Sequence, residues 1–127
     1  MKWYSTPILI FIVILTGCSG SEVYQGTWKA TDSVGNKFEI DFEPKSFTVK
    51  DANGKVKTYS YTQNSVTYRN GQKTYGIRLG DGRIFKIHFP LTDDTGKGAI
   101  MTQTDNPLYT ICRTEYIAYN DLYNLME

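Results

Sequence analysis

The sequence predicts a mainly β domain: an antiparallel up-and-down meander of eight or nine strands, forming a small closed or half-open barrel, with a C-terminal helix. Three observations support this fold class. From residue 24 onward, apolar and polar residues alternate with a period of two, which is typical of antiparallel strands with one buried face and one wet face. Short turn sequences rich in Gly, Asn and Asp separate the alternating runs. From Thr114 the period changes to that of a helix.

The turn lengths and the alternation together predict a register for the first seven strands, because a slip of one residue would move every side chain to the opposite face. At Asn53-Gly54 a two-residue turn would place the following tyrosines on the wrong face. We therefore predict a three-residue loop with Gly54 in the left-handed conformation. The other predicted turns are residues 33–35, 44–45, 63–64, 70–71 and 80–82. The predicted facing pairs are Trp28 with Ile40, Ala30 with Phe38, Phe42 with Phe47, Phe47 with Tyr59, Tyr61 with Val66, Val66 with Tyr75, and Ile77 with Phe85.

The rest of the domain continues with a longer polar loop over residues 90–97, strands over 98–104 and 108–113, and a turn at 105–107 between them. Thr114 is then the predicted N-cap of a helix. Its apolar stripe is best placed against the outer wall of the barrel. The stripe consists of Tyr116, Tyr119, Leu122, Tyr123, Leu125 and Met126.

The N-terminus predicts export. Lys2 precedes an unbroken apolar run at residues 8–15, which is too short to span a bilayer and is typical of a secretory signal peptide. The run leads into Leu15-Thr16-Gly17-Cys18, which resembles the bacterial lipobox. The resemblance implies removal of residues 1–17, acylation of Cys18, a short tether over 18–23 and a barrel domain over 24–127. Ser19 after the cysteine implies sorting to the outer membrane, on either face of it.

The net charge and the cysteine content limit the classes of partner that this chain is expected to bind. The 14 basic and 13 acidic residues nearly cancel, so no electrostatic footprint for nucleic acid is present, and membrane attachment falls to the acyl chains. If Cys18 carries lipid, Cys112 has no partner within the chain. Cys112 lies among apolar residues and is expected to be a small buried hydrophobe.

Gly26-Thr27-Trp28 opens the first strand, and Arg113 ends the last one just before the helix. With the meander, these residues resemble lipocalins and related calycin barrels. The resemblance implies that Trp28 closes one end of a barrel and that Arg113 lies across its indole ring. The alternative is that Trp28 is simply a core residue of a β-sandwich or a half-open barrel.

No catalytic constellation is visible. His88 is the only histidine, so a zinc site made of several histidines is excluded. Its parity in the strand places it on the wet face. Asp93-Asp94, with Asp81 and Asp105 in other loops, lack the spacing of a calcium loop. We therefore expect no enzyme activity, no metal and no cofactor.

The leading functional hypothesis is a lipid-anchored, non-enzymatic binding or protein-interaction module of the cell envelope, such as an accessory component of a secretion assembly, an immunity protein or an inhibitor. The alternative is a lipocalin-like carrier of a small apolar ligand. A filled interior with an exposed aromatic patch would favour the first, the patch drawing on Tyr61, Tyr68, Tyr116, Tyr119 and Tyr123. A cavity would favour the second, its predicted lining being Trp28, Phe38, Ile40, Tyr59, Tyr75 and Phe85.

Overall fold

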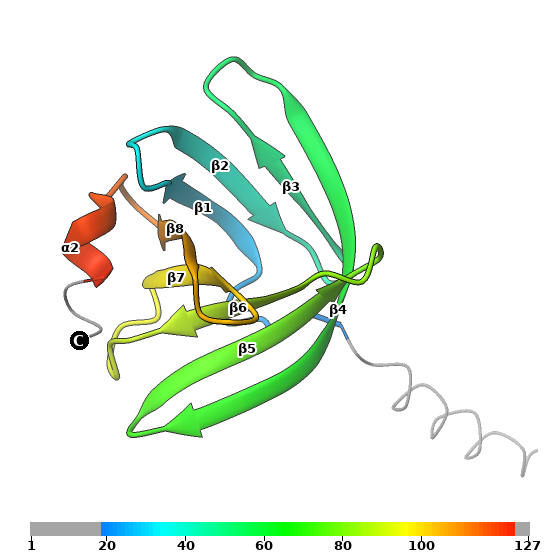
Figure 1. The fold of residues 1–127 in the computed structure, drawn as a ribbon, viewed down its shortest axis with the longest axis vertical. Coiled ribbons are helices and arrows are strands. Elements are labelled where there is room, and N and C mark those ends of the chain that lie inside the picture. Colours follow the sequence, from blue (N-terminus) through cyan, green and yellow to red (C-terminus); the bar gives the residue numbers. More distant parts are fainter. Residues whose placement is uncertain (1–18, 124–127) are drawn as a thin grey trace, which may run out of the picture.

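A computed structural model describes residues 19–123 as a closed barrel of eight antiparallel strands with one short helix (Figure 1). Each strand pairs with the next along the chain, and the last pairs with the first, so the predicted meander and its closure are confirmed. The predictions for residues 1–18, Leu125 and Met126 lie outside the described residues. The elements are β1 (Gly26–Thr31), β2 (Lys37–Phe42), β3 (Ser46–Lys50), β4 (Val56–Arg69), β5 (Gln72–Leu79), β6 (Ile84–Phe89), β7 (Lys97–Thr102), β8 (Pro107–Cys112) and α2 (Tyr119–Tyr123).

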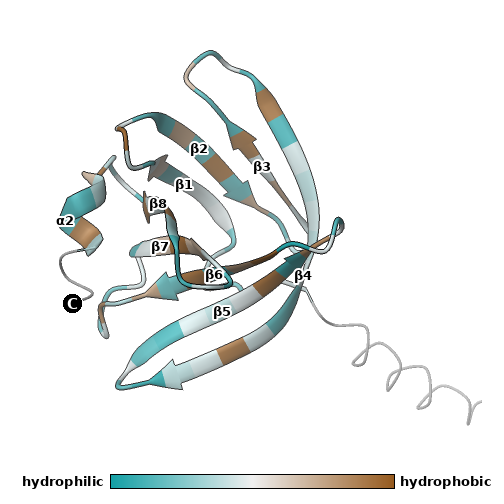
Figure 2. Cartoon of the chain, viewed as in Figure 1, coloured by the Kyte–Doolittle hydropathy of each residue, from teal (hydrophilic) through white to brown (hydrophobic). Residues whose placement is uncertain are grey.

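The predicted register is confirmed at all but one of the facing pairs. Hydrophobic and hydrophilic residues alternate along the strands (Figure 2), so correct pairing turns one apolar set toward the barrel axis. The two-residue turn at Asn70-Gly71 is also confirmed, since both residues have positive φ, 53° and 79°. The confirmed pairs are Trp28 with Ile40, Ala30 with Phe38, Phe42 with Phe47, Phe47 with Tyr59, Val66 with Tyr75, and Ile77 with Phe85.

The predicted turn at Gln63-Asn64 is wrong, and with it the count of nine strands. β4 runs without a turn through these residues, and Tyr61 faces Leu79 of β5 instead of Val66. A β-bulge between Gln63 and Ser65 adds one residue to β4, which shifts the alternation without reversing the chain. Gln63 can stay inside because its Oε1 accepts hydrogen bonds from Tyr24 Oη and the Ser21 amide.

The distal part of the β4–β5 hairpin differs from the prediction as well. The predicted pairing places Val66 on the buried face, yet Val66 is 46% exposed, and Tyr68, two residues further along the strand, is 65% exposed. In Figure 1 this hairpin reaches past the rest of the barrel, so its distal inward positions have no opposite wall to pack against. Only the nearer half of the hairpin contributes to the core, through Tyr75, Ile77 and Leu79.

Four loops at one end of the barrel share a single turn geometry. In each, the amide of the first residue donates to the carbonyl of the fifth, and the amide of the fourth donates to the carbonyl of the first. The fourth residue always has positive φ: Gly35 (90°), Gly54 (85°), Gly82 (96°) and Asp105 (69°). The three predicted three-residue loops, including the left-handed Gly54, are confirmed. The turn predicted at 105–107 starts earlier, because Asp105 takes the position that glycine takes elsewhere.

The C-terminal helix packs on the outer wall, as predicted, but begins later. Leu122 is buried against the outward side chains Ala99 and Met101 of β7. The predicted N-cap at Thr114 is wrong, since α2 starts at Tyr119. Ile117 breaks the helical stripe, and it packs on the same outer cluster while its carbonyl accepts a hydrogen bond from Thr110 Oγ1. Cys112, at the end of β8, is a buried free thiol, as expected. Within residues 19–123, no helix is long and apolar enough to cross a membrane.

The shared turn geometry makes a prediction for Gly54. Gly54→Ala should lower the free energy of unfolding by about 1–2 kcal/mol, because φ of 85° is unfavourable for a residue with Cβ while no atom lies within contact distance of the added methyl. Urea denaturation measures this. Gly54→Asn is the matched control and should lose less, since Asn tolerates the left-handed region; an equal loss in both variants would contradict the backbone explanation.

Candidate functional site

One end of the barrel is closed by Trp28 and Tyr24, both fully buried. The indole Nε1 of Trp28 donates to the carbonyl of Tyr24 at 2.8 Å, which ties the segment before β1 to the barrel floor. The Tyr24 ring meets Phe42 at 5.3 Å and Tyr75 at 5.2 Å, both edge-on, and Trp28 lies 6.0 Å from Phe89. These rings pack against one another across the closed end.

Arg113 completes the closed end from outside. Its guanidinium carbon lies 3.8 Å from the Trp28 ring centre, a cation–π contact. The same group donates to the carbonyls of Val23 at 3.1 Å, Gln25 at 2.7 Å and Thr27 at 3.2 Å. Partial burial lowers the pKa of Arg113 from its ordinary value, but an arginine remains charged at neutral pH. Gly26 lies directly beside this guanidinium and has φ of 99°, a backbone that favours glycine.

Residues 20–23, which are part of the segment expected to form a polar tether, are held against the closed end. The Gly20 amide donates to the Pro44 carbonyl at 2.7 Å, and Tyr61 Oη donates to the Glu43 carbonyl at 2.6 Å. Tyr24 Oη donates to Gln63 at 2.8 Å, and burial raises the pKa of this phenol far above its ordinary value, which keeps it a donor. The chain is therefore fixed to the barrel from Gly20 onward.

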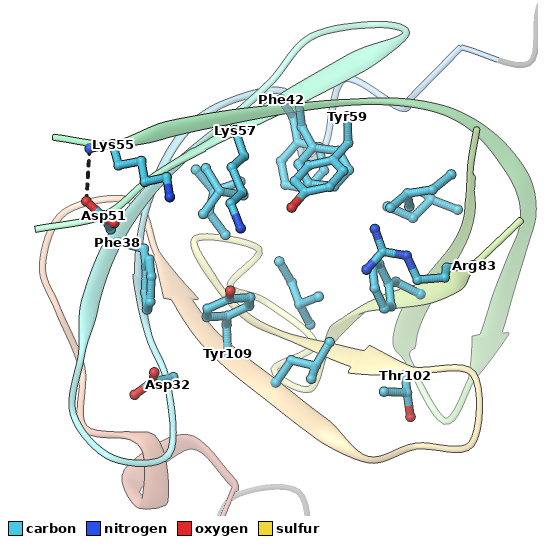
Figure 3. A pocket seen from close by; sticks show the side chains of 18 residues that line it. Asp32, Phe38, Phe42, Asp51, Lys55, Lys57, Tyr59, Arg83, Thr102 and Tyr109 are labelled. Carbon is cyan, nitrogen blue, oxygen red and sulfur yellow. Dashed lines mark hydrogen bonds between the residues drawn. The ribbon is translucent and has the colours of Figure 1, made fainter. Parts of the chain in front are cut away.

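The other half of the interior is hollow. A cavity of about 590 Å³ opens at the end formed by the four matching loops (Figure 3), within the size range of small-molecule pockets. Its wall is mainly aromatic and aliphatic. The lining residues are Asp32, Phe38, Ile40, Phe42, Phe47, Val49, Asp51, Lys55, Lys57, Tyr59, Ile77, Leu79, Arg83, Phe85, Ile100, Thr102, Leu108 and Tyr109.

Four of the six residues predicted to line a cavity do so, and two do not. Phe38, Ile40, Tyr59 and Phe85 do line it. Trp28 and Tyr75 do not, because they belong to the packed rings at the closed end. The division follows position along the strands: Trp28 is near the start of β1, whereas Phe38 is near the start of the antiparallel β2 and therefore at the opposite end.

The mouth carries polar residues that the sequence analysis did not assign to the site. Lys57 occupies an inward position of β4, facing Val49, and points its ammonium into the cavity (Figure 3). It has the same parity as Tyr59 and Tyr61, so continuing the alternation one step back would have found it. The Arg83 guanidinium carbon lies 5.6 Å from the ring centres of both Tyr59 and Phe85, and Arg83 also pairs with Asp81 at 2.8 Å.

The five tyrosines proposed for an exposed patch do not all lie on one surface. Tyr61 is buried at the closed end, and Tyr123 donates to the Tyr109 carbonyl and lies 4.6 Å from Tyr119. Tyr116 lies near the ammonium groups of Lys29 and Lys37, whereas Tyr68 lies near that of Lys73 on the distal β4–β5 hairpin.

The remaining candidates take structural positions. His88 is outside the barrel with its Nδ1 2.7 Å from Thr74 Oγ1, and partial burial lowers its pKa. Asp81 pairs with Arg83, Asp105 with Lys86, and Asp94 accepts the Gly96 amide. Within residues 19–123 no three metal-binding side chains converge.

No known protein family matches the sequence, and no curated protein matches it.

Substitutions of Arg113 test whether its contacts at the closed end stabilise the barrel. Arg113→Met should lower the free energy of unfolding by roughly 2–4 kcal/mol, because it removes the contact with Trp28 and leaves three carbonyls without their charged donor. Arg113→Lys should recover only part of this loss, since an ammonium cannot stack and reach all three carbonyls together. Arg78→Met, at an exposed position of β5, is the control and should change stability by less than about 0.5 kcal/mol. Equal stability of the Arg113 and Arg78 variants in thermal or urea denaturation would contradict the assigned role.

Proposed function

We propose that this protein binds a small apolar molecule inside the barrel, acting as a carrier and not as an enzyme. The observation that carries the proposal is the cavity of about 590 Å³, closed at one end by packed rings and open at the other. An eight-stranded barrel has an interior that side chains either fill or leave free for one small ligand. Apolar walls of this size gain free energy by excluding water around an apolar guest.

The same observations favour a carrier over a protein-interaction module. The interior is hollow at one end, and most of the large exposed apolar side chains lie on different elements: Val34 in the β1–β2 turn, Val56 at the start of β4 and Tyr116 before α2, with Val66 and Tyr68 as one pair on the distal β4–β5 hairpin. Dispersed single residues are ordinary on protein surfaces, whereas a docking surface for a protein partner needs a contiguous apolar centre.

Filling the cavity tests the proposal. Val49→Trp places a large ring in the cavity and should weaken binding of the neutral fluorescent probe N-phenyl-1-naphthylamine by about tenfold or more, as measured by fluorescence titration. Thr48→Trp is the matched control: Thr48 is the preceding residue of β3 and faces Asp41 and Thr58 on the outer surface. It should bind the probe as the original protein does.

Two results would contradict the carrier. One is the absence of probe binding to the unaltered protein. The other is equal binding by the Val49→Trp and Thr48→Trp variants, both folded by circular dichroism, since the probe would then sit on the surface.

We further propose that an acylated Cys18 anchors the barrel to the cell envelope, most simply in the outer membrane. The apolar run and the lipobox-like Leu15-Thr16-Gly17-Cys18 support this. The fixed position of Gly20 against Pro44 gives the anchor a geometric consequence. Only Ser19 separates Cys18 from the docked chain, so the closed end would face the membrane and the cavity mouth would face away from it.

Metabolic labelling tests the anchor. Cells that express the full chain should incorporate a clickable fatty-acid analogue into the protein and retain it in the membrane fraction. Cys18→Ala should abolish both, because the thiol that accepts the lipid is gone, whereas Cys112→Ala should leave labelling intact. Undiminished labelling of Cys18→Ala would refute lipidation at this residue.

A further inference from the structure

We infer that the cavity takes a single-chain amphiphile with an anionic head, its chain directed toward the closed end and its head at the mouth beside Lys57. This inference rests on the proposed function and specifies the chemical class of its ligand. It follows from the distribution of polar groups along the barrel, from their sign, and from two phenol groups that face the cavity.

Polarity is graded along the cavity axis. The deep part is lined by apolar side chains such as Phe42, Phe47 and Ile77, all buried. The charged lining residues belong to the mouth, in the turns or beside them (Figure 3). A uniformly apolar guest would leave the charged groups at the mouth without a partner. A molecule with one polar end matches both parts of the wall.

The acidic groups of the mouth are already occupied. The Asp32 carboxylate accepts the amides of Val34 and Asn36 and the side-chain amide of Asn36, and thereby shapes the β1–β2 turn. The Asp51 carboxylate accepts the amides of Asn53 and Lys55 in the same way. Such carboxylates stabilise their turns, and the charged residues that line the cavity are these two acidic side chains against three basic ones, Lys55, Lys57 and Arg83.

The basic groups, by contrast, are available. Among residues 19–123 neither Lys55 nor Lys57 forms a salt bridge or donates a side-chain hydrogen bond, and both ammonium groups point toward the cavity (Figure 3). Arg83 shares its guanidinium with the exposed Asp81, a pairing that water and salt weaken. The available charge at the mouth is therefore positive.

Two phenols supply neutral donors beside these charges. The hydroxyls of Tyr59 and Tyr109 point into the cavity, where Tyr59 lies beside Arg83 and the Tyr109 hydroxyl has no hydrogen-bond partner within the described part of the chain (Figure 3). Partial burial, with Asp32 nearby, raises the pKa of Tyr109, so its hydroxyl remains a donor at neutral pH. Hydrogen bonds from such donors to a charged acceptor are stronger than those to a neutral one.

Carboxylate and phosphate heads share this chemistry, and the test includes both. The protein is loaded with N-phenyl-1-naphthylamine, and the probe is displaced by four compounds with the same twelve-carbon chain, each below its micelle concentration. These are dodecanoate, dodecyl phosphate, dodecanol and dodecyltrimethylammonium. Dodecanoate, dodecyl phosphate or both should displace the probe at concentrations about tenfold lower than dodecanol, and the cationic compound should be the weakest.

Lys57→Met, which keeps the length and removes the charge, should reduce the preference for the anion over dodecanol to about threefold or less, with dodecanol itself unaffected. Lys50→Met is the matched control, because Lys50 is an exposed residue of β3 that faces Glu39 on the outer surface. It should keep the original preference.

The outcomes separate the two proposals. Displacement by dodecanol or the cationic compound at concentrations equal to or below those of both anions would overturn the anionic head and leave the apolar carrier standing. An anion preference unchanged in Lys57→Met would overturn the assignment of the head to Lys57. Failure of every compound, with no binding of the probe itself, would overturn the carrier as well.

Discussion

The contact between Arg113 and Trp28 is the interaction on which the rest of the structure depends. It joins the end of β8 to the residues before and within β1, and so fixes the two strands whose pairing closes the barrel. A guanidinium is suited to this position, because one planar group can cover an aromatic face and still donate several hydrogen bonds in its plane. The carbonyls it holds belong to the segment that carries Tyr24, so the same contact keeps the Tyr24 ring under the barrel.

Closure at one end explains why the other end is hollow. The interior of a barrel of this strand number is narrow, and large rings such as Tyr24, Trp28 and Phe89 fill it at the floor. Toward the mouth, inward positions carry Val49 and Leu108, which are smaller, and Lys57, whose ammonium extends toward water. Packed rings therefore fill the closed end, whereas the cavity lies between walls that carry aromatic side chains such as Phe38 and Tyr109 together with these smaller ones.

The sequence predicted the parts of this fold that depend on local alternation and turn chemistry. Register was correct wherever a turn of fixed length joined two alternating runs, as at Gly54 and Asn70-Gly71. It failed at Asn64, because a bulge and a turn both interrupt the alternation, and the hydrogen bond from Tyr24 to Gln63 that accompanies the bulge is a tertiary contact that local alternation does not predict. The late start of α2 has a similar cause, since it depends on tertiary contacts of Ile117. Four of the six residues predicted for the cavity wall do line it. Parity separates inward from outward side chains, but it does not separate the floor from the mouth.

The mouth of the cavity consists of the four matching loops, which form its rim, and of the charged side chain of Lys57, which lies on strand β4. Its four loops share one hydrogen-bonded turn, so the rim is ordered before any ligand arrives, and little conformational entropy is lost on binding. Lys57 stands on β4 and not in a loop, which fixes its direction. Because its ammonium reaches water at the mouth, the desolvation that would make a lysine costly deeper in the barrel is small there. Lys57, the residue proposed to distinguish the two ends of a ligand, therefore lowers the stability of the fold only slightly. Substitutions at such inward strand positions near the mouth can change which ligand is bound without disturbing the closed end, which holds the barrel together.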